Sequence, residues 1–313
     1  MPNSNYPNGF ANGVTVRGVP LVVAHPGRVF WVNNSSVLAP NGVGGSDGNA
    51  GTYQKPFSTI DYAIGKCTAG RGDIIMVMPG HAETITAADA ILLDVTGVSI
   101  VGLGSGTLMP RIDFNNTAAT VGVSADNVSI LNMHFRALIS AVVVGVNVKA
   151  DADGVTVEKC LFSAETAGTD EFNHSIRFVD NNSRCAVKDC VIDMGIAGAV
   201  AGIHLDADTA FLVIEDNIIR GDYSTANITG DTTLSTNLLI KGNLLENGIG
   251  GDLNTEPGIE LLTGSTGTIA DNYIVCNVAT AAAATVADAC LHFQNKYNET
   301  VSTTGKNLEV ADA

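Results

Sequence analysis

The chain has 313 residues, of which 45% are hydrophobic and only 15% charged, and its formal net charge is −16. This acidic balance argues against direct binding to nucleic acid or to an anionic membrane. The sequence shows no basic, apolar leader and no run of about 18 apolar residues, so we expect neither a secretory signal nor a membrane span.

Residues 1–45 form the first predicted segment and lack the repeat pattern of the later chain. A polar stretch rich in Asn, Pro and Gly precedes two short β-type runs. The segment still carries apolar residues that require a partner surface. These are Tyr6, Phe10, Val14, Val16, Val19 and Leu21. We predict an extended arm whose first residues, 1 to about 35, anchor the protein by adding a strand to the sheet edge of another subunit or protein. The alternative is that the arm lies on its own chain, against the outward-facing Val101 and Leu131.

A short helix is predicted near residues 58–68, after a loop rich in Gly, Asp and Asn. Asp61 lies in its first turn, where the helix dipole stabilises a negative charge. The apolar face is expected to consist of Ile60, Ala63, Ile64 and Cys67. We expect this helix to cover the end of the repeat region, because an open end would expose apolar side chains and unpaired strand groups.

Residues 46–295 are dominated by a short apolar strand that recurs at nearly constant spacing. Seven copies begin at residues 98, 128, 155, 185, 212, 238 and 267, so successive copies are 26–30 residues apart. A period in the range of about 20–50 residues, with one short strand in each unit, is typical of a solenoid. A strand that begins near residue 73 is expected to open the first full coil, with Ile75 and Val77 pointing inward.

The aligned copies divide into inward-facing and outward-facing columns, because side chains alternate along a strand. The third position is apolar throughout and is predicted to point inward: Ile100, Ile130, Val157, Val187, Ile214, Ile240 and Ile269. The fourth position should face solvent, and four consecutive copies carry Glu158, Lys188, Glu215 and Lys241 there. Equivalent residues of adjacent coils lie about 4.8 Å apart, so these charges are expected to form a ladder of alternating sign.

The sixth position contains asparagine in three consecutive copies, namely Asn217, Asn243 and Asn272. Asparagine is common at turns for local reasons. Its recurrence in one column nevertheless predicts an internal ladder, in which each amide hydrogen-bonds its neighbour and the turn backbone.

These columns resemble those of right-handed parallel β-helix proteins of the pectate-lyase-like superfamily, over roughly residues 45–295. The predicted fold class is therefore all-β: a right-handed parallel β-helix with a short N-terminal capping helix, an extended N-terminal arm and a C-terminal tail at 296–313. A repeat pattern of this kind identifies architecture well and activity poorly.

The first 110 residues resemble more specifically a family of bacteriophage-encoded β-helix proteins found among virion structural genes. The motifs that carry the resemblance lie at residues 13–21, 29–32, 45–64, 72–85 and 97–105. The resemblance implies a component of a phage particle, located on the capsid surface and assembled in the cytoplasm of a host bacterium. It also implies a major capsid protein or another virion protein as partner, and a homotrimer.

A second strand in each copy gathers ionisable residues of catalytic type. Its outward column is expected to contain Asp113, Val143, Arg177, His204, a residue near Ile228, Glu260 and His292. Arg177 and His204 should be neighbours, with Asp206 two residues further along the same strand face. Asp206 and Asp208 are candidates for glycoside hydrolysis, which needs two carboxyl groups about 5–9.5 Å apart.

Two functions compete on this evidence. The column mixes charge signs, and the single tryptophan, Trp31, is expected to lie outside the coils, although sugar clefts commonly use aromatic platforms. We therefore favour a non-enzymatic virion structural protein, a capsid decoration or head-fibre-like subunit. The alternative is a tailspike-type protein that binds or cleaves polysaccharide through Arg177, His204, Asp206 and Asp208. The six cysteines lack metal-site spacing, so we expect buried thiols and neither a metal nor another cofactor.

Overall fold

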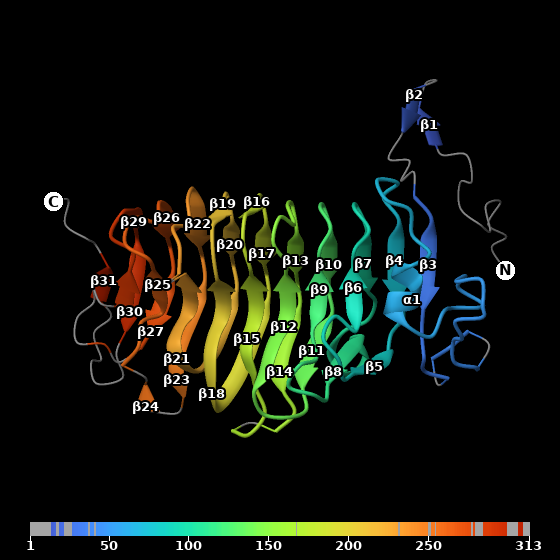
Figure 1. The fold of residues 1–313 in the computed structure, drawn as a ribbon, viewed down its shortest axis with the longest axis horizontal. Coiled ribbons are helices and arrows are strands. Elements are labelled where there is room, and N and C mark those ends of the chain that lie inside the picture. Colours follow the sequence, from blue (N-terminus) through green and yellow to red (C-terminus); the bar gives the residue numbers. More distant parts are fainter. Residues whose placement is uncertain are drawn as a thin grey trace.

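A computed structural model describes residues 14–16, 19–21, 27–36, 38–40, 42–166, 168–230, 232–249, 252–253, 255–276, 278, 284–298 and 306–308. This part of the chain forms a right-handed parallel β-helix, which confirms the predicted all-β fold class. Figure 1 shows the coils stacked in chain order along the long axis of the molecule. We call the three sides of the coil the first, second and third face, in the order in which the chain crosses them.

The first face is a parallel sheet built from the recurring apolar strand. It consists of β3 (Val29–Val32), β4 (Ile74–Val77), β7 (Ser99–Gly102), β10 (Ser129–Leu131), β13 (Thr156–Glu158), β17 (Ala186–Lys188), β20 (Val213–Glu215), β22 (Leu238–Lys241), β26 (Gly267–Ala270) and β29 (Cys290–Phe293). The third-position residues of neighbouring strands are direct partners, as Ile130 is with Ile100 and Val157. Every residue of that column is at most 3% exposed, which confirms that it points inward.

The second and third faces form one continuous sheet around the rest of the coil. The second face consists of β5 (Ala82–Ile85), β8 (Arg111–Phe114), β11 (His134–Ala137), β14 (Leu161–Ala164), β23 (Leu244–Ile249), β27 (Tyr273–Val275) and β30 (Asn295–Asn298). The third face consists of β6 (Ile91–Leu93), β9 (Val121–Val123), β12 (Val142–Val148), β15 (Phe172–Phe178), β25 (Ile259–Leu261) and β28 (Thr285–Val286). Two long strands, β18 (Val191–Leu205) and β21 (Ile218–Gly230), run over both faces.

Short elements complete the coils. A separate pair, β16 (Asn182–Ser183) and β19 (Thr209–Ala210), lies between the third face and the next first-face strand. The other short elements are the 3-10 helix η1 (Gly106–Leu108), β24 (Asp252–Leu253), which pairs with β23, and β31 (Lys306–Leu308), which pairs antiparallel with β30. The segment expected to be a C-terminal tail from residue 296 therefore begins inside a strand of the second face.

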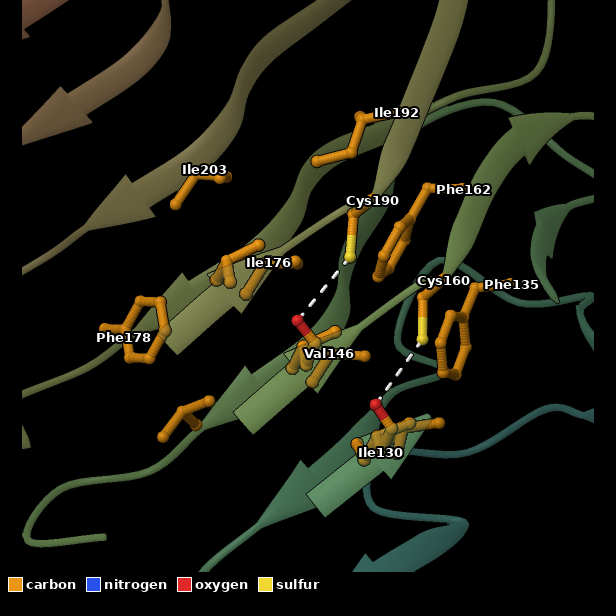
Figure 2. Packing of buried hydrophobic residues seen from close by; sticks show 14 of the residues in the cluster. Ile130, Phe135, Val146, Cys160, Phe162, Ile176, Phe178, Cys190, Ile192 and Ile203 are labelled. Carbon is orange, nitrogen blue, oxygen red and sulfur yellow. Dashed lines mark hydrogen bonds between the residues drawn. The ribbon is translucent and has the colours of Figure 1, made fainter. Parts of the chain in front are cut away.

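Aromatic side chains fill the core beneath the second face. Phe135 and Phe162 are register partners, and their rings stack with centroids 4.8 Å apart. Phe172 meets Phe114 edge to face at 4.9 Å. Figure 2 shows Phe135 and Phe162 one above the other, beside the cysteines of adjacent coils. These in-register contacts explain why the coils keep a constant spacing in this region.

The cysteines behave as small buried side chains, as predicted. Five are buried and Cys67 is half-buried, and all six are free thiols. The Cys160 and Cys190 thiols donate to the carbonyl oxygens of Ile130 and Val157 over 3.7 and 3.6 Å, and Figure 2 shows both bonds. Thiols in such surroundings are shielded and unreactive.

The predicted asparagine ladder is confirmed inside the corner between the first and second faces. Asn217 Nδ2 donates to Asn243 Oδ1, and Asn243 Nδ2 donates to Asn272 Oδ1, both over 2.9 Å. Each amide also donates to a backbone carbonyl of the preceding coil at 3.0 Å. Asn295 extends the ladder by one coil beyond the prediction. All four side chains are thus buried with hydrogen-bond partners, as buried amides require.

This corner is sharp because its outer residue adopts the left-handed conformation in each coil. The φ angles lie between +49° and +69° at Asn132, Lys159, Asp189, Asp216, Gly242, Asp271 and Gln294. Asn, Asp and Gly tolerate this conformation best, which explains why they dominate the position next to the ladder. Lys159 and Gln294 show that the coil imposes the same angle on less suited residues.

The outward charge ladder on the first face is formed in part. Glu158, Lys188, Glu215 and Lys241 are successive register partners, as predicted. Lys188 Nζ lies 3.3 Å from Glu215 Oε2. Glu158, however, pairs with Lys159 next to it in sequence. The corner residue competes for Glu158 because its side chain starts from the adjacent backbone position.

The N-terminal end of the solenoid is closed by a helix and a loop. The helix α1 (Ile60–Ile64) is shorter than the predicted 58–68, and it buries Ile60, Ala63 and Ile64. Asp47 fixes its start by accepting hydrogen bonds from the backbone N–H groups of Ser58 and Thr59 at 2.9 and 3.1 Å. The chain turns directly after Gly65, which ends the helix. A cap of one turn is sufficient to cover the first coil, and this role agrees with the prediction.

The solenoid begins earlier than expected. Trp31, predicted to lie outside the coils, belongs to β3, where it pairs with Met76 of β4. The outer edge of β3 is covered, because the Trp31 N–H donates to the Gly51 carbonyl and its carbonyl accepts from the Phe57 N–H, both at 2.8 Å. The sequence repeat could not reveal this strand because the loop and helix separate it from the second copy.

The N-terminal segment contains a hairpin where an extended arm was expected. β1 (Val14–Val16) and β2 (Val19–Leu21) pair antiparallel, and among the described strands each pairs only with the other. Of the predicted anchoring residues, Tyr6 and Phe10 lie outside the described residues. No helix in the described part of the chain is long and apolar enough to cross a membrane.

Candidate functional site

The third face presents an outward column of polar residues midway along the solenoid. Its successive register partners are Asn147, Arg177, His204, Thr229 and Glu260. The residues on either side in each strand point inward, as Ile203 and Leu205 do at 0% exposure. Alternation therefore directs the column away from the core. The coil that was uncertain near Ile228 contributes Thr229.

Arg177 and His204 lie side by side at the centre of this column, and both approach Asp206. Arg177 Nη1 is 3.8 Å from Asp206 Oδ2, and His204 Nε2 is 4.0 Å from Asp206 Oδ1. Arg177 Nε also donates to Asn147 Oδ1 over 3.2 Å. The structure thus brings together three of the four residues that the sequence suggested for a glycan site.

His174 joins this cluster from the preceding part of β15. Its ring stacks on that of His204, with centroids 4.5 Å apart and an interplanar angle of 20°. Burial lowers the pKa of His174 to about 4, and the neighbouring His204 and Arg177 lower it further in the same direction. His174 is therefore neutral at pH 7 and can stack on a second imidazole without charge repulsion.

Asp208, the fourth candidate, is not part of the cluster. β18 ends at Leu205, so Asp206 and Asp208 follow the strand and do not alternate along it. Asp208 is exposed and lines a separate groove of about 510 Å³. The groove is lined by Asn181, Asn182, Ser183, Asp208, Thr209, Ala210, Leu234 and Thr236. The expectation that both carboxylates share one strand face is wrong because the chain leaves the strand before reaching either.

Three other residues assigned to the outward column lie elsewhere. Asp113 is on the second face, opposite Arg136, and His292 is on the first face. Val143 is replaced in the column by Asn147, the partner of Arg177. All faces of the coil offer a polar residue between two apolar ones, so this local pattern cannot tell them apart. The coil length could have done so, because Asn147 precedes Arg177 by 30 residues.

The chemistry open to this cluster is limited by its single carboxylate. A glycosidase needs two carboxyl groups about 5–9.5 Å apart. Glu260 lies two coils beyond His204, which is about 10 Å along the axis at roughly 4.8 Å per coil, and Thr229 lies between them. Within the described ranges, no three His, Cys, Asp or Glu side chains are grouped to hold a metal ion. The arrangement can hold a polar or anionic group at the surface, but it presents no acid–base pair.

The fold and this surface together define a parallel β-helix protein with self-paired polar columns. The chain belongs to the DUF1565 family, described as proteins of unknown function, whose profile matches residues 43–299. Among solved structures, a rhamnogalacturonan lyase is similar at 12% identity and a TM-score of 0.35, over 86% of this chain and 87% of that chain. That similarity concerns the course of the backbone alone. No curated protein sequence matches this chain.

Proposed function

We propose that this protein is a non-enzymatic structural subunit of a bacteriophage particle. It serves there as a capsid decoration or head-fibre-like protein on the outer surface, with the major capsid protein or another virion protein as its partner. Residues 1–35 anchor it, and the β-helix projects from the surface. The subunit is assembled in the cytoplasm of the host as a homo-oligomer.

The observation that carries this proposal is the use of outward charges within the chain itself. Asp206 approaches Arg177 and His204. On the second face, Arg220 binds Glu246 at 2.7 Å and Asp193 at 3.7 Å. Ladders of this kind fix the register of coils, since a shift by one residue would bury charges. They are suited to a rigid rod and leave no paired acid and base for hydrolysis.

Two features of the sequence support the phage assignment. The first 110 residues resemble phage virion β-helix proteins in motif and order. The formal net charge of −16 suits a soluble outer surface that avoids nucleic acid.

A density map of the intact particle tests the proposal. We expect a rod of stacked coils on the capsid, with its N-terminal end toward the shell. Density on a tail fibre tip that contacts receptor would favour the tailspike function, and a particle that lacks the chain would contradict the proposal.

Polysaccharide recognition is the second candidate function, and the groove beside Asp208 favours it. The groove combines amide, hydroxyl and carboxylate groups with the apolar side chain of Leu234. Such a lining suits the mixed polar and apolar surface of a sugar. A glycan array with the purified protein tests this candidate, and Asp208→Asn should reduce any binding that occurs in this groove.

A further inference from the structure

The second face carries an apolar stripe along the outside of the solenoid. Val191 is the register partner of Ile218, Ile218 of Leu244, and Leu244 of Tyr273. These four side chains are 36%, 38%, 36% and 39% exposed in that order. Leu161 continues the stripe by one coil in the N-terminal direction. We call these five residues the apolar stripe.

The stripe is not needed for the core. In each coil the preceding and the following residue point inward, as Asn217 and Ile219 do on either side of Ile218, at 1% and 0% exposure. The outward position is free to be polar, and it becomes polar at both ends of the stripe. His134 and Arg111 occupy it on the N-terminal side, and Lys296 on the C-terminal side. Apolar residues in consecutive coils of an outward column indicate a contact surface.

The charges that border the stripe are nearly balanced, unlike those of the whole chain. Seven basic residues lie in the stripe column and the columns beside it: Arg111, Arg136, Lys159, Lys188, Arg220, Lys241 and Lys296. Eight acidic residues lie there as well: Asp113, Glu158, Asp189, Asp193, Glu215, Asp216, Glu246 and Asp271. The region therefore holds seven of the 16 basic residues of the chain but only eight of its 32 acidic ones. Its net charge of −1 contrasts with −16 for the chain.

We infer that the second face is where copies of this chain meet, side by side and parallel, with their apolar stripes facing a common axis. A second copy fits because its stripe is an equally straight ridge, about 19 Å long for five coils at roughly 4.8 Å. Two chains of charge −16 repel one another over most of their surface, but they can approach through this neutral region. The parallel direction rests on the proposed function, since N-terminal arms that bind one capsid must lie at the same end of the oligomer.

Native mass spectrometry of Ile218→Asp tests the face. The side chain is exposed in the single chain, so the variant should fold and melt cooperatively like the unmodified protein. We expect the unmodified protein to be an oligomer and the variant to fall to a single chain of 32.3 kDa. Val143→Asp is the matched control, because Val143 is 44% exposed on β12, away from the stripe, and it should leave the oligomer intact. An unmodified protein that is monomeric, or an oligomer that survives Ile218→Asp, overturns the inference.

Cysteine cross-linking tests the direction. In a parallel oligomer each residue of the stripe faces its own counterpart, so Val191→Cys and Leu244→Cys should each form disulfide-linked multimers under mild oxidation. An antiparallel pair can align one of these positions with itself but never both. Val143→Cys and the unmodified protein, whose cysteines are buried or half-buried, serve as controls. Cross-linking at only one position, or at neither, overturns the parallel arrangement. Both experiments use purified protein, so absence of the chain from phage particles would refute the proposed function without altering these results.

Discussion

Cys190 and Asn217 occupy the same inward position in adjacent coils, and the backbone N–H of Cys190 donates to Asn217 Oδ1 over 2.9 Å. The Cys190 thiol bonds to a carbonyl of the preceding coil, as the Asn217 amide does. The column thus changes from thiols to amides without a change of register. Hydrogen bonds inside this corner therefore hold the spacing between coils.

The amide ladder predicts a large stability loss for Asn243→Leu. The substitution leaves the Asn217 N–H groups and Asn272 Oδ1 without their partner inside a dry corner. Each unsatisfied buried group costs about 1–3 kcal/mol, so we expect a total loss of roughly 3–5 kcal/mol. Urea unfolding followed by circular dichroism measures it. Asn173→Leu, at a half-buried position of β15, is the control and should change stability by less than about 1 kcal/mol. Equal effects of the two substitutions would refute the role of the ladder.

The inward column predicts that Ile214→Asp prevents folding. Ile214 is 0% exposed, and an uncompensated carboxylate in such a place costs several kcal/mol. We expect aggregated or unfolded protein, whereas Ile218→Asp in the same coil should remain soluble and folded. Thermal melting of both variants makes the comparison. Soluble Ile214→Asp protein with a normal melting temperature would contradict the register.

The repeat made these columns predictable because parallel in-register strands place equivalent residues directly above one another. A column of seven apolar residues such as that of Ile214 has one consistent explanation, and Asn217, Asn243 and Asn272 share their position for the same reason. The candidate site was less predictable. Asn147 and Val143 both lie between apolar residues, and only the length of the coil separates them. His174 reaches His204 from the neighbouring strand, a contact that no column of the sequence represents.

Two buried histidines predict that the protein loses stability in mild acid. Burial lowers the pKa of His134 and of His174 to about 4, from 6.5 for an exposed histidine. Between these values the unfolded chain binds more protons than the folded chain, so stability falls as pH falls from 6.5 to 4 and is unaffected by these groups above 6.5. Melting temperatures across this range should decline less steeply in the double variant His134→Gln and His174→Gln. An unchanged slope in the double variant would show that these residues do not set the acid sensitivity.

The single carboxylate of the third-face cluster predicts that the protein does not degrade host glycans. Capsule or lipopolysaccharide incubated with the purified protein should release no reducing ends over time, because no second carboxyl group stands opposite Asp206. The positive control is a known depolymerase on the same substrate. Time-dependent release that disappears in Asp206→Asn or Asp208→Asn would instead establish an enzyme.

The most direct test of a particle subunit anchored by its N-terminal segment is deletion of residues 1–22. This deletion removes β1 and β2, which pair only with each other among the described strands, and leaves β3 and the coils in place. The truncated protein should therefore fold, as thermal melting can verify, but its occupancy on purified particles, measured by quantitative mass spectrometry, should fall to background. Occupancy equal to that of the full-length protein would contradict the account.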